Sequence, residues 1–137
     1  MLVDKAVPIL LREKDGQQEI LVFEHPLAGR QLVKGTIEAG ESAEGAAVRE
    51  LFEESGLEGV SQTIFLGVQE YRDIDQRWHF VLCQLGFEPA EAWDHYTEDG
   101  GGHTFHFLWQ PLDRPIHNPN GEVFERARQF VFDLLNG

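Results

Sequence analysis

The sequence predicts an α/β fold in which a mixed β-sheet lies between two helices, an α/β/α sandwich. Three observations predict it: short apolar runs separated by turn residues, a capped helical segment in the first half of the chain, and an amphipathic segment at its C-terminal end. The 137 residues suit a single domain spanning 1–137. A chain of this length buries enough surface to fold without disulfides.

Strands are expected wherever an apolar run is flanked by turn residues. The predicted strands comprise residues 6–11, 20–23, 64–71, 77–85 and 104–109. The first two should form a hairpin, and Pro8 favours an edge or a bulge in the first of them. Residues 88–102 are acidic and end in three glycines, and a segment of this length is more typical of a functional loop than of a connector.

The two expected helices carry different signals. Ser42 is a suitable N-cap and Gly56 a suitable left-handed stop for a helix over residues 42–55. The second helix begins near Asn120, and its apolar residues recur at i, i+1, i+4, i+7, i+8, i+11 and i+12 from Val123. This spacing forms one apolar stripe, which should pack on the sheet. We expect the two helices on opposite sides of the sheet.

The charge balance restricts the class of ligand. Asp and Glu number 24 against 11 Lys and Arg, which gives a formal net charge of -13. Such a protein repels polyanions, so unaided binding to a nucleic-acid backbone is not expected. A phosphate-rich ligand would need metal cations to bridge the two like charges.

The single cysteine, Cys83, excludes an internal disulfide and a cysteine-based zinc cluster. It lies in an apolar run and is expected to be a buried strand residue. No apolar run approaches the ~18 residues that a membrane span needs. The N-terminus has no signal-peptide pattern, so we expect no membrane association and a cytoplasmic location.

Three glutamates lie on one stripe of the first helix. At 100° per residue, Glu50, Glu53 and Glu54 fall within about 100° of one another, at the i, i+3, i+4 spacing whose side chains meet. A solvated acidic face would explain the pattern. However, like charges at this spacing cost about 0.2–0.5 kcal/mol per pair, and Glu54 also opposes the helix dipole. A hard divalent cation such as Mg²⁺ would reverse both penalties.

The residues around this stripe fit the same interpretation. Gly35 and Gly40 allow backbone carbonyls to come close to a metal, because glycine has no side chain in the way. Glu41 lies at the helix start, where a negative charge is favourable. Arg49 can hold a neighbouring carboxylate with its rigid donor fork.

The stretch from residue 35 to residue 57 resembles the Nudix box in every defined position. The matching residues are Gly35, Glu41, Arg49, Glu50, Leu51, Glu53, Glu54, Gly56 and Leu57. The resemblance implies a Nudix-type α/β/α sandwich. It also implies hydrolysis of a phosphoanhydride bond in a nucleoside diphosphate linked to another moiety, with Mg²⁺ or Mn²⁺ as cofactor.

The resemblance also assigns roles to individual residues. The implied metal ligands are Glu50, Glu53, Glu54 and the carbonyl of Gly35. One glutamate would activate the attacking water, and Arg49 and Glu41 would orient the ligands. Many members use a further acid from a later loop, for which the candidate is Glu98, followed by Glu91 and Asp99. His103 and His106 lie on opposite faces of a strand, so at most one faces the site.

A small-molecule nucleotide is the expected partner. The candidate substrate-binding residues are Arg30, Lys34, Tyr71 and Arg77, with Trp93 and Tyr96 as a lid. No proline follows Leu57 before Pro89, which argues against the ADP-ribose subclass. A nucleoside triphosphate or a dinucleoside polyphosphate is favoured over a capped RNA.

Two other classes of protein remain open. A Nudix-fold sensor would bind a nucleotide without cutting it, although such modules commonly lose a box carboxylate. An isoprenoid diphosphate isomerase shares the fold but uses a cysteine, and Cys83 in a strand matches that poorly. Dimers are common in the family, and no feature of the sequence demands one.

Overall fold

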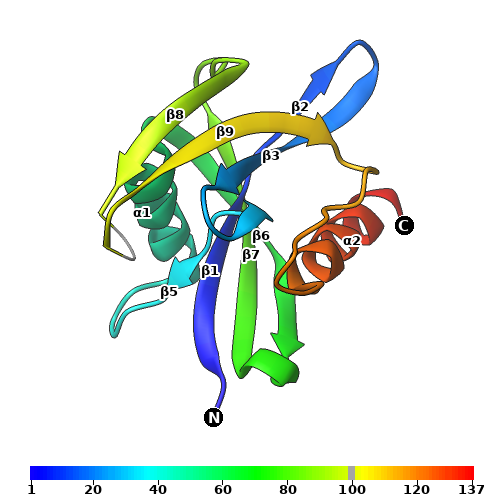
Figure 1. The fold of residues 1–137 in the computed structure, drawn as a ribbon. Helices are drawn as coiled ribbons and strands as arrows, with labels where there is room; N and C mark the ends of the chain where they lie inside the picture. The colour runs from blue at the N-terminus through cyan, green and yellow to red at the C-terminus, as the bar shows by residue number, and fades with distance from the viewer. Residues whose placement is uncertain (99–100) are drawn as a thin grey trace.

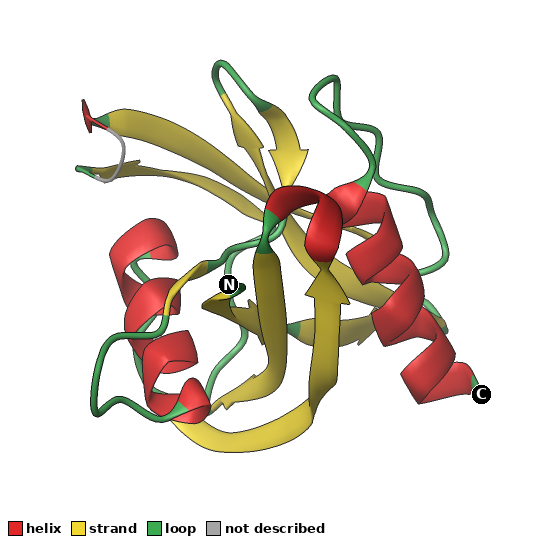
Figure 2. Ribbon diagram, turned by 90° about the horizontal axis from the view of Figure 1, so that it is seen from below, coloured by secondary structure: helices red, strands yellow, loops and turns green. Residues whose placement is uncertain are grey.

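The computed structural model describes residues 1–98 and 101–137, which form two β-sheets flanked by two helices (Figure 1). In chain order the elements are β1 (Val3–Ile9), β2 (Leu11–Lys14), β3 (Gln17–His25), β4 (Gly29–Gln31), β5 (Gly35–Thr36), α1 (Ala43–Ser55), β6 (Val60–Tyr71), the short 3₁₀ turn η1 (Arg72–Ile74), β7 (Gln76–Leu85), β8 (Ala92–Thr97), β9 (His103–Pro111) and α2 (Val123–Asn136). The helices lie on opposite sides of the strands (Figure 2). The predicted α/β/α arrangement is therefore confirmed.

The first sheet is mixed, as predicted, with strand order β5-β1-β7-β6. Strands β1 and β7 run parallel, with Lys5 opposite Trp78, and the other pairs are antiparallel. The second sheet, β2-β3-β9-β8 with β4 on β3, is antiparallel and was not predicted as separate.

The chain crosses from the first sheet to the second at Leu10. The predicted strand 6–11 is therefore split, because β1 pairs with β7 whereas β2 turns away to pair with β3. The predicted hairpin is the β2–β3 pair. Its turn uses Asp15 at φ 52° and Gly16 at φ 79°, the left-handed pair that a tight hairpin requires.

Alternation along the central strands divides the core between the two helices. Val7 and Ile9 of β1 face an apolar cluster that α2 covers, whereas Ala6 of β1 and the following Leu10 face a second cluster under α1. Successive side chains of a strand point to opposite faces, so each helix is held by its own half of the same strands. This fixes α1, and with it the glutamate stripe, against β1 and β5.

The predicted ends of α1 are confirmed. Ser42 caps its start, because its Oγ accepts a hydrogen bond from the Gly45 N–H at 3.0 Å. Gly56 ends it in the left-handed conformation at φ 79°, and its N–H donates to the Phe52 carbonyl at 2.9 Å. These local signals place the glutamates within the last two turns.

The expectation of a long functional loop over 88–102 is wrong for its middle part. Strand β8 pairs with β9 there, with Trp93 opposite Phe107. The Trp93 ring stacks on Phe107 with centroids 5.3 Å apart, and its Nε1 donates to the Ser55 carbonyl at 2.9 Å. Trp93 is therefore a packing residue and not a lid, whereas Tyr96 is 60% exposed. Asp99, a reserve candidate for catalysis, lies outside the described residues.

No helix in the described part of the chain has the length and apolar character of a membrane span.

Cys83 is a buried strand residue, as predicted. It lies in β7, its side chain belongs to the cluster under α1, and it is 3% exposed. Burial raises the pKa of its thiol to about 12. The thiolate is the reactive form of cysteine, so this thiol is chemically silent in the native fold.

We expect Cys83 to resist Ellman's reagent at pH 8 in the folded protein and to react fully in denaturant. Native labelling should be at least ~100-fold slower than that of a free cysteine, because both the thiolate and access to it are suppressed. Rapid labelling of the native protein, with unchanged circular dichroism, would contradict this placement.

Candidate active site

The helix α1 buries two of its three candidate glutamates. Glu50 is 6% exposed and Glu54 is 7% exposed, and their side chains share a hydrogen bond one helical turn apart. Burial raises the pKa of Glu50, while hydrogen bonds from Glu54 and Arg49 oppose that rise. Two contacting carboxyl groups taken out of water are costly unless counter-charges compensate them.

Gly35 closes one side of this carboxyl pair. A Cβ added at Gly35 would lie 1.9 Å from Cδ of Glu50 and 2.2 Å from each of its carboxylate oxygens. A side chain at this point of β5 would therefore displace the Glu50 carboxylate, because β5 is held by pairing with Lys5 and Ala6 of β1. The backbone of the loop and the Glu50 carboxylate meet in a cradle that any side chain would fill.

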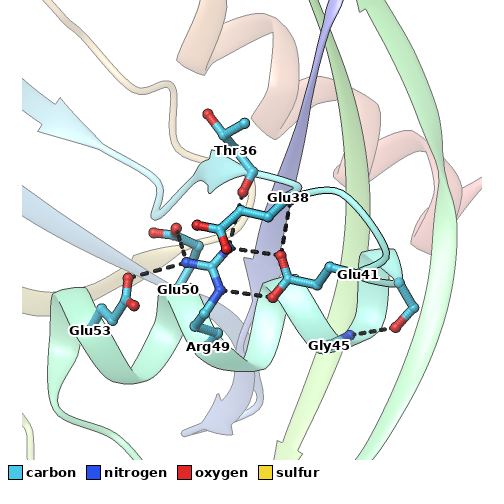
Figure 3. A network of polar contacts seen from close by, with 8 residues as sticks. Thr36, Glu38, Glu41, Gly45, Arg49, Glu50 and Glu53 are labelled. Atoms are coloured by element: carbon cyan, nitrogen blue, oxygen red, sulfur yellow. Dashed lines mark hydrogen bonds and ion pairs between the residues drawn. The ribbon is translucent and has the colours of Figure 1, made fainter.

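Arg49 joins the parts of the site (Figure 3). Its guanidinium donates to Glu41 through Nε at 2.8 Å and Nη2 at 2.9 Å, to Glu50 through Nη1 at 2.7 Å, to Glu53 through Nη1 at 3.2 Å, and to the Thr36 carbonyl through Nη2 at 3.0 Å. One side chain thus connects β5, the loop before α1 and the carboxylate stripe. The sequence predicted that Arg49 orients a neighbouring carboxylate, and these contacts are of that kind.

Glu41 completes this network from the loop. Its Oε1 accepts from the Glu38 N–H at 3.1 Å as well as from Arg49. The hydrogen bond from Arg49 lowers the pKa of Glu41 to about 2. Glu41 therefore stays ionised at neutral pH and fixes the direction of the guanidinium.

The groups of this site that could bind a metal ion all present oxygen atoms. Carboxylates and a backbone carbonyl are the ligands that Mg²⁺ prefers, and Glu50, Glu54 and the Gly35 backbone provide them in one place. In residues 1–98 and 101–137, however, no three acidic, histidine or cysteine side chains form a ready metal cluster. The Glu53 side chain is 42% exposed and turned toward Arg49.

Lys34 lies beside the carboxylates, as its position next to Gly35 suggested. Its Nζ lies 5.7 Å from the centroid of the Trp78 ring. Burial lowers the pKa of Lys34, and the nearby Lys5 lowers it further, while Glu54 and Glu50 act in the opposite direction. The structure thus brings this substrate-binding candidate to the site.

Lys5, which the sequence did not single out, lies near Lys34 and lowers the pKa of that lysine. It lies opposite Thr36 in the β1–β5 pair, and its Nζ donates to the Thr36 Oγ1 at 2.8 Å. Alternation along β1 points Lys5 and Val7 to the same face, opposite to the face that Ala6 presents to the cluster under α1. The sequence could not place Lys5 beside Thr36, because β5 is only two residues long.

Tyr71 is not brought to the carboxylates. It is 4% exposed, packs edge-on to Trp78 at 4.9 Å, and lies in the cluster under α2. Arg126 covers its ring at 5.1 Å. A ring buried in this way cannot stack on a nucleobase unless the core opens, so this placement gives the predicted substrate role no support.

The other two basic candidates already hold carboxylates. Arg77 binds Asp4 at 3.1 Å and Glu70 at 3.2 Å, and Arg30 binds Glu24 at 2.7 Å. Neither contacts the carboxylate stripe in the described residues. Their roles in substrate binding stay predictions.

The ends of β8 separate the acidic candidates. Glu98 follows β8 and is exposed, whereas Glu91 precedes it and is bound by Arg12 and Lys14. A strand of this length spans ~20 Å, so the two carboxylates are far apart and Glu91 is committed elsewhere. His106 binds Asp94 at 2.6 Å.

A second histidine lies near the start of β9. His103 packs against His25, with ring centroids 4.7 Å apart. His25 in turn accepts hydrogen bonds on its Nδ1 from the N–H groups of Leu27 and Ala28, at 3.0 and 3.1 Å. Both rings lie at strand ends, and within the described residues neither contacts Glu50, Glu53 or Glu54.

Comparison with known proteins identifies the family. The NUDIX domain model matches residues 3–133, so the chain belongs to the Nudix family. No curated protein is similar enough in sequence to count as a match.

Solved structures of the same fold include a mutT/nudix family protein from Listeria innocua, with 16% identity and a TM-score of 0.62 over 97% of this chain and 93% of that one. An Ap4A hydrolase of C. elegans in a binary complex has 19% identity and a TM-score of 0.64, over 98% of both chains. The NUDIX domain of Shewanella oneidensis NrtR complexed with ADP ribose has 16% identity and a TM-score of 0.60, over 99% of this chain and 90% of that one. At these identities the likeness shows the fold.

We expect Gly35→Ala to lower stability by about 1–3 kcal/mol, because the new methyl group overlaps the Glu50 carboxylate. Urea denaturation measures the change. Gly86→Ala is the matched control, since a Cβ there meets nothing within 4 Å. The loss of stability caused by Gly35→Ala should largely vanish in a Glu50→Ala background. An equal loss in both backgrounds would show that the overlap with Glu50 is not the cause.

We expect Arg49→Gln to return the pKa of Glu41 from about 2 toward its ordinary value of 4.5. A lowered pKa in the folded state stabilises the protein above the unfolded-state pKa, and that stability is lost as the pH falls toward the folded-state pKa. The stability gap between wild type and variant should therefore narrow between pH 4.5 and pH 2.

Carboxyl-detected NMR titration and denaturation at several pH values measure both effects. Arg72→Gln, which removes an exposed arginine bound to Glu70, is the control and should leave Glu41 unchanged. A Glu41 pKa that is the same in wild type and Arg49→Gln would refute the assignment.

Proposed function

We propose that this protein is a Mg²⁺- or Mn²⁺-dependent Nudix hydrolase. It cleaves a phosphoanhydride bond in a nucleoside diphosphate linked to another moiety. A nucleoside triphosphate or a dinucleoside polyphosphate is the favoured substrate class. Family membership supports hydrolysis of pyrophosphate bonds in nucleotide derivatives as the reaction class.

One observation carries this proposal: Glu50 and Glu54 are buried in contact with each other, against a glycine where a Cβ would overlap the Glu50 carboxylate. A purely structural acidic face would be solvated. Buried carboxyl pairs are found where a cation or a proton is handled. The oxygen-only donor set and the cradle at Gly35 fit a hard divalent cation held by Glu50, Glu53, Glu54 and the Gly35 carbonyl.

The chain's own residues divide the work. Arg49 positions Glu50 and Glu53 through its Nη1 and is itself anchored by Glu41. Glu53, the most exposed of the three, is free to turn toward the substrate without disturbing the core. A bound divalent cation would neutralise the diphosphate and lower the pKa of the attacking water. One glutamate then takes the proton of that water.

The two lysines supply the charge that the acidic surface lacks. Lys34 directly precedes β5 and Lys5 lies opposite Thr36 of β5, and neither lysine forms an ion pair within the described residues. Ammonium groups in this position can bind the phosphates next to the scissile bond. The likeness to the Ap4A hydrolase fold is consistent with a polyphosphate substrate.

A nucleotide sensor is the second candidate. The NUDIX domain of NrtR, which shares this fold, was solved in complex with ADP ribose. The complete carboxylate set of the present chain favours the hydrolase. A sensor would bind a nucleotide tightly and release no product.

Glu53→Gln and Glu54→Gln should each lower turnover by ~10²–10⁴-fold while the fold is retained. The assay is a nucleotide panel with Mg²⁺ or Mn²⁺, with products identified by which phosphate is released. Glu44→Gln, a change of the same kind on the same helix but off the glutamate stripe, should retain activity.

Three outcomes would remove the hydrolase proposal. They are full activity in Glu54→Gln, full activity in excess chelator, and no product from any compound in the panel with correctly folded protein. Tight nucleotide binding in the third case would establish the sensor instead.

A further inference from the structure

A pocket away from the glutamates lies between the end of β3, β4 and the segment that leads from β9 into α2. Its volume is about 330 Å³. It is lined by Glu24, Gly29, Arg30, Arg114, Pro115 and His117. Small-molecule sites begin at ~300 Å³, so this pocket is large enough for a small polar group.

The pocket is positively charged in a protein that is otherwise strongly acidic. Two guanidinium groups and one imidazole face a single carboxylate, Glu24, and Arg30 already holds that carboxylate at 2.7 Å. The Arg114 side chain makes no hydrogen bond or ion pair within residues 1–98 and 101–137. With a net charge of -13, a cation left without a carboxylate is a local point of attraction for anions.

The pocket is held in shape by a buried amide. Gln110 is 1% exposed; its Oε1 accepts from the Arg30 Nη1 at 3.0 Å and its Nε2 donates to the Arg114 carbonyl at 2.7 Å. Asn118 adds a second link, because its Nδ2 donates to the Arg30 carbonyl at 2.9 Å. These bonds fix the Arg30 guanidinium relative to the backbone at Arg114, which reduces part of the ordering cost of binding.

The nearby Glu125 is engaged with another cation. It binds Arg128 at 2.6 Å and accepts from the Ile116 N–H at 2.7 Å. This carboxylate is therefore paired with Arg128 and not with Arg114.

We propose that this pocket binds a phosphate group, with Arg114 as the principal donor and Arg30 as the second. The phosphate can be a distal group of the substrate or the free anion. Binding of a distal substrate phosphate rests on the proposed function, whereas binding of the free anion does not. Arg30 lies five residues before Gly35, a separation of at most ~17 Å along extended chain, so one polyphosphorylated compound can reach both places.

The first test titrates inorganic phosphate into the full chain at constant ionic strength, followed by NMR of the arginine side chains and by calorimetry. Arg114→Gln should weaken binding by ~10-fold, because it removes a charge-assisted contact. Lys14→Gln removes the same charge from β2, where Lys14 pairs with the far end of β3, and it should change the affinity by less than ~2-fold.

The proposal is overturned if Arg114→Gln binds phosphate as the wild type does. It is equally overturned if Lys14→Gln weakens binding as much as Arg114→Gln, since net charge alone would then explain the effect. Arg114 is exposed, so its variant should keep the wild-type melting temperature, which is measured in parallel.

A second test separates the two sources of the phosphate. With the best substrate from the panel, a several-fold rise in KM at constant kcat in Arg114→Gln assigns the pocket to a distal phosphate of the substrate. Weakened phosphate binding with unchanged KM assigns it to the free anion. If no panel compound is hydrolysed, the proposed function fails while the titration still decides whether the pocket binds phosphate.

Discussion

The group of carboxylates around α1 depends on one guanidinium, that of Arg49, for compensation of its charge. Arg49 contacts Glu41, Glu50 and Glu53 at once, and it reaches back to the Thr36 carbonyl of β5. Without it, a partly buried group of carboxylates would face only one another, and removing one partner from such a network leaves charges uncompensated. The same contacts tie the loop before α1 to the helix, so one interaction both compensates the charge of the site and shapes it.

The parts of the site that depend on local chemistry were predictable from the sequence. Ser42 and Gly56 mark the ends of α1 through hydrogen bonds within the helix itself, and helical spacing then places Glu50 and Glu54 together. Gly35 was expected to allow a close backbone approach. The structure adds that the group that approaches is the Glu50 carboxylate.

The parts that depend on distant pairing were not predictable. Strand β8 lies within an acidic segment that ends in glycines, and it is a strand because β9 pairs with it along its whole length. Tyr71 ends β6, where a register shift between Phe65 and Gly67 precedes the turn into β7. The offset of Tyr71 from the motif does not reveal which face of β6 its ring occupies, and the fold places that ring in the core under α2.

The distribution of cations links the site to the rest of the surface. Most arginine side chains of this protein bind a carboxylate, as expected where acids outnumber bases by 24 to 11. Within the described residues, Lys5, Lys34 and Arg114 do not. The two lysines lie next to β5, and the arginine lines the pocket beside β4. An anion approaching this molecule is repelled by most of its surface, so the field favours the few places where positive charge is left uncompensated. The proposed selectivity for phosphate-bearing ligands would thus depend on which basic side chains lack a carboxylate partner as much as on where basic side chains lie.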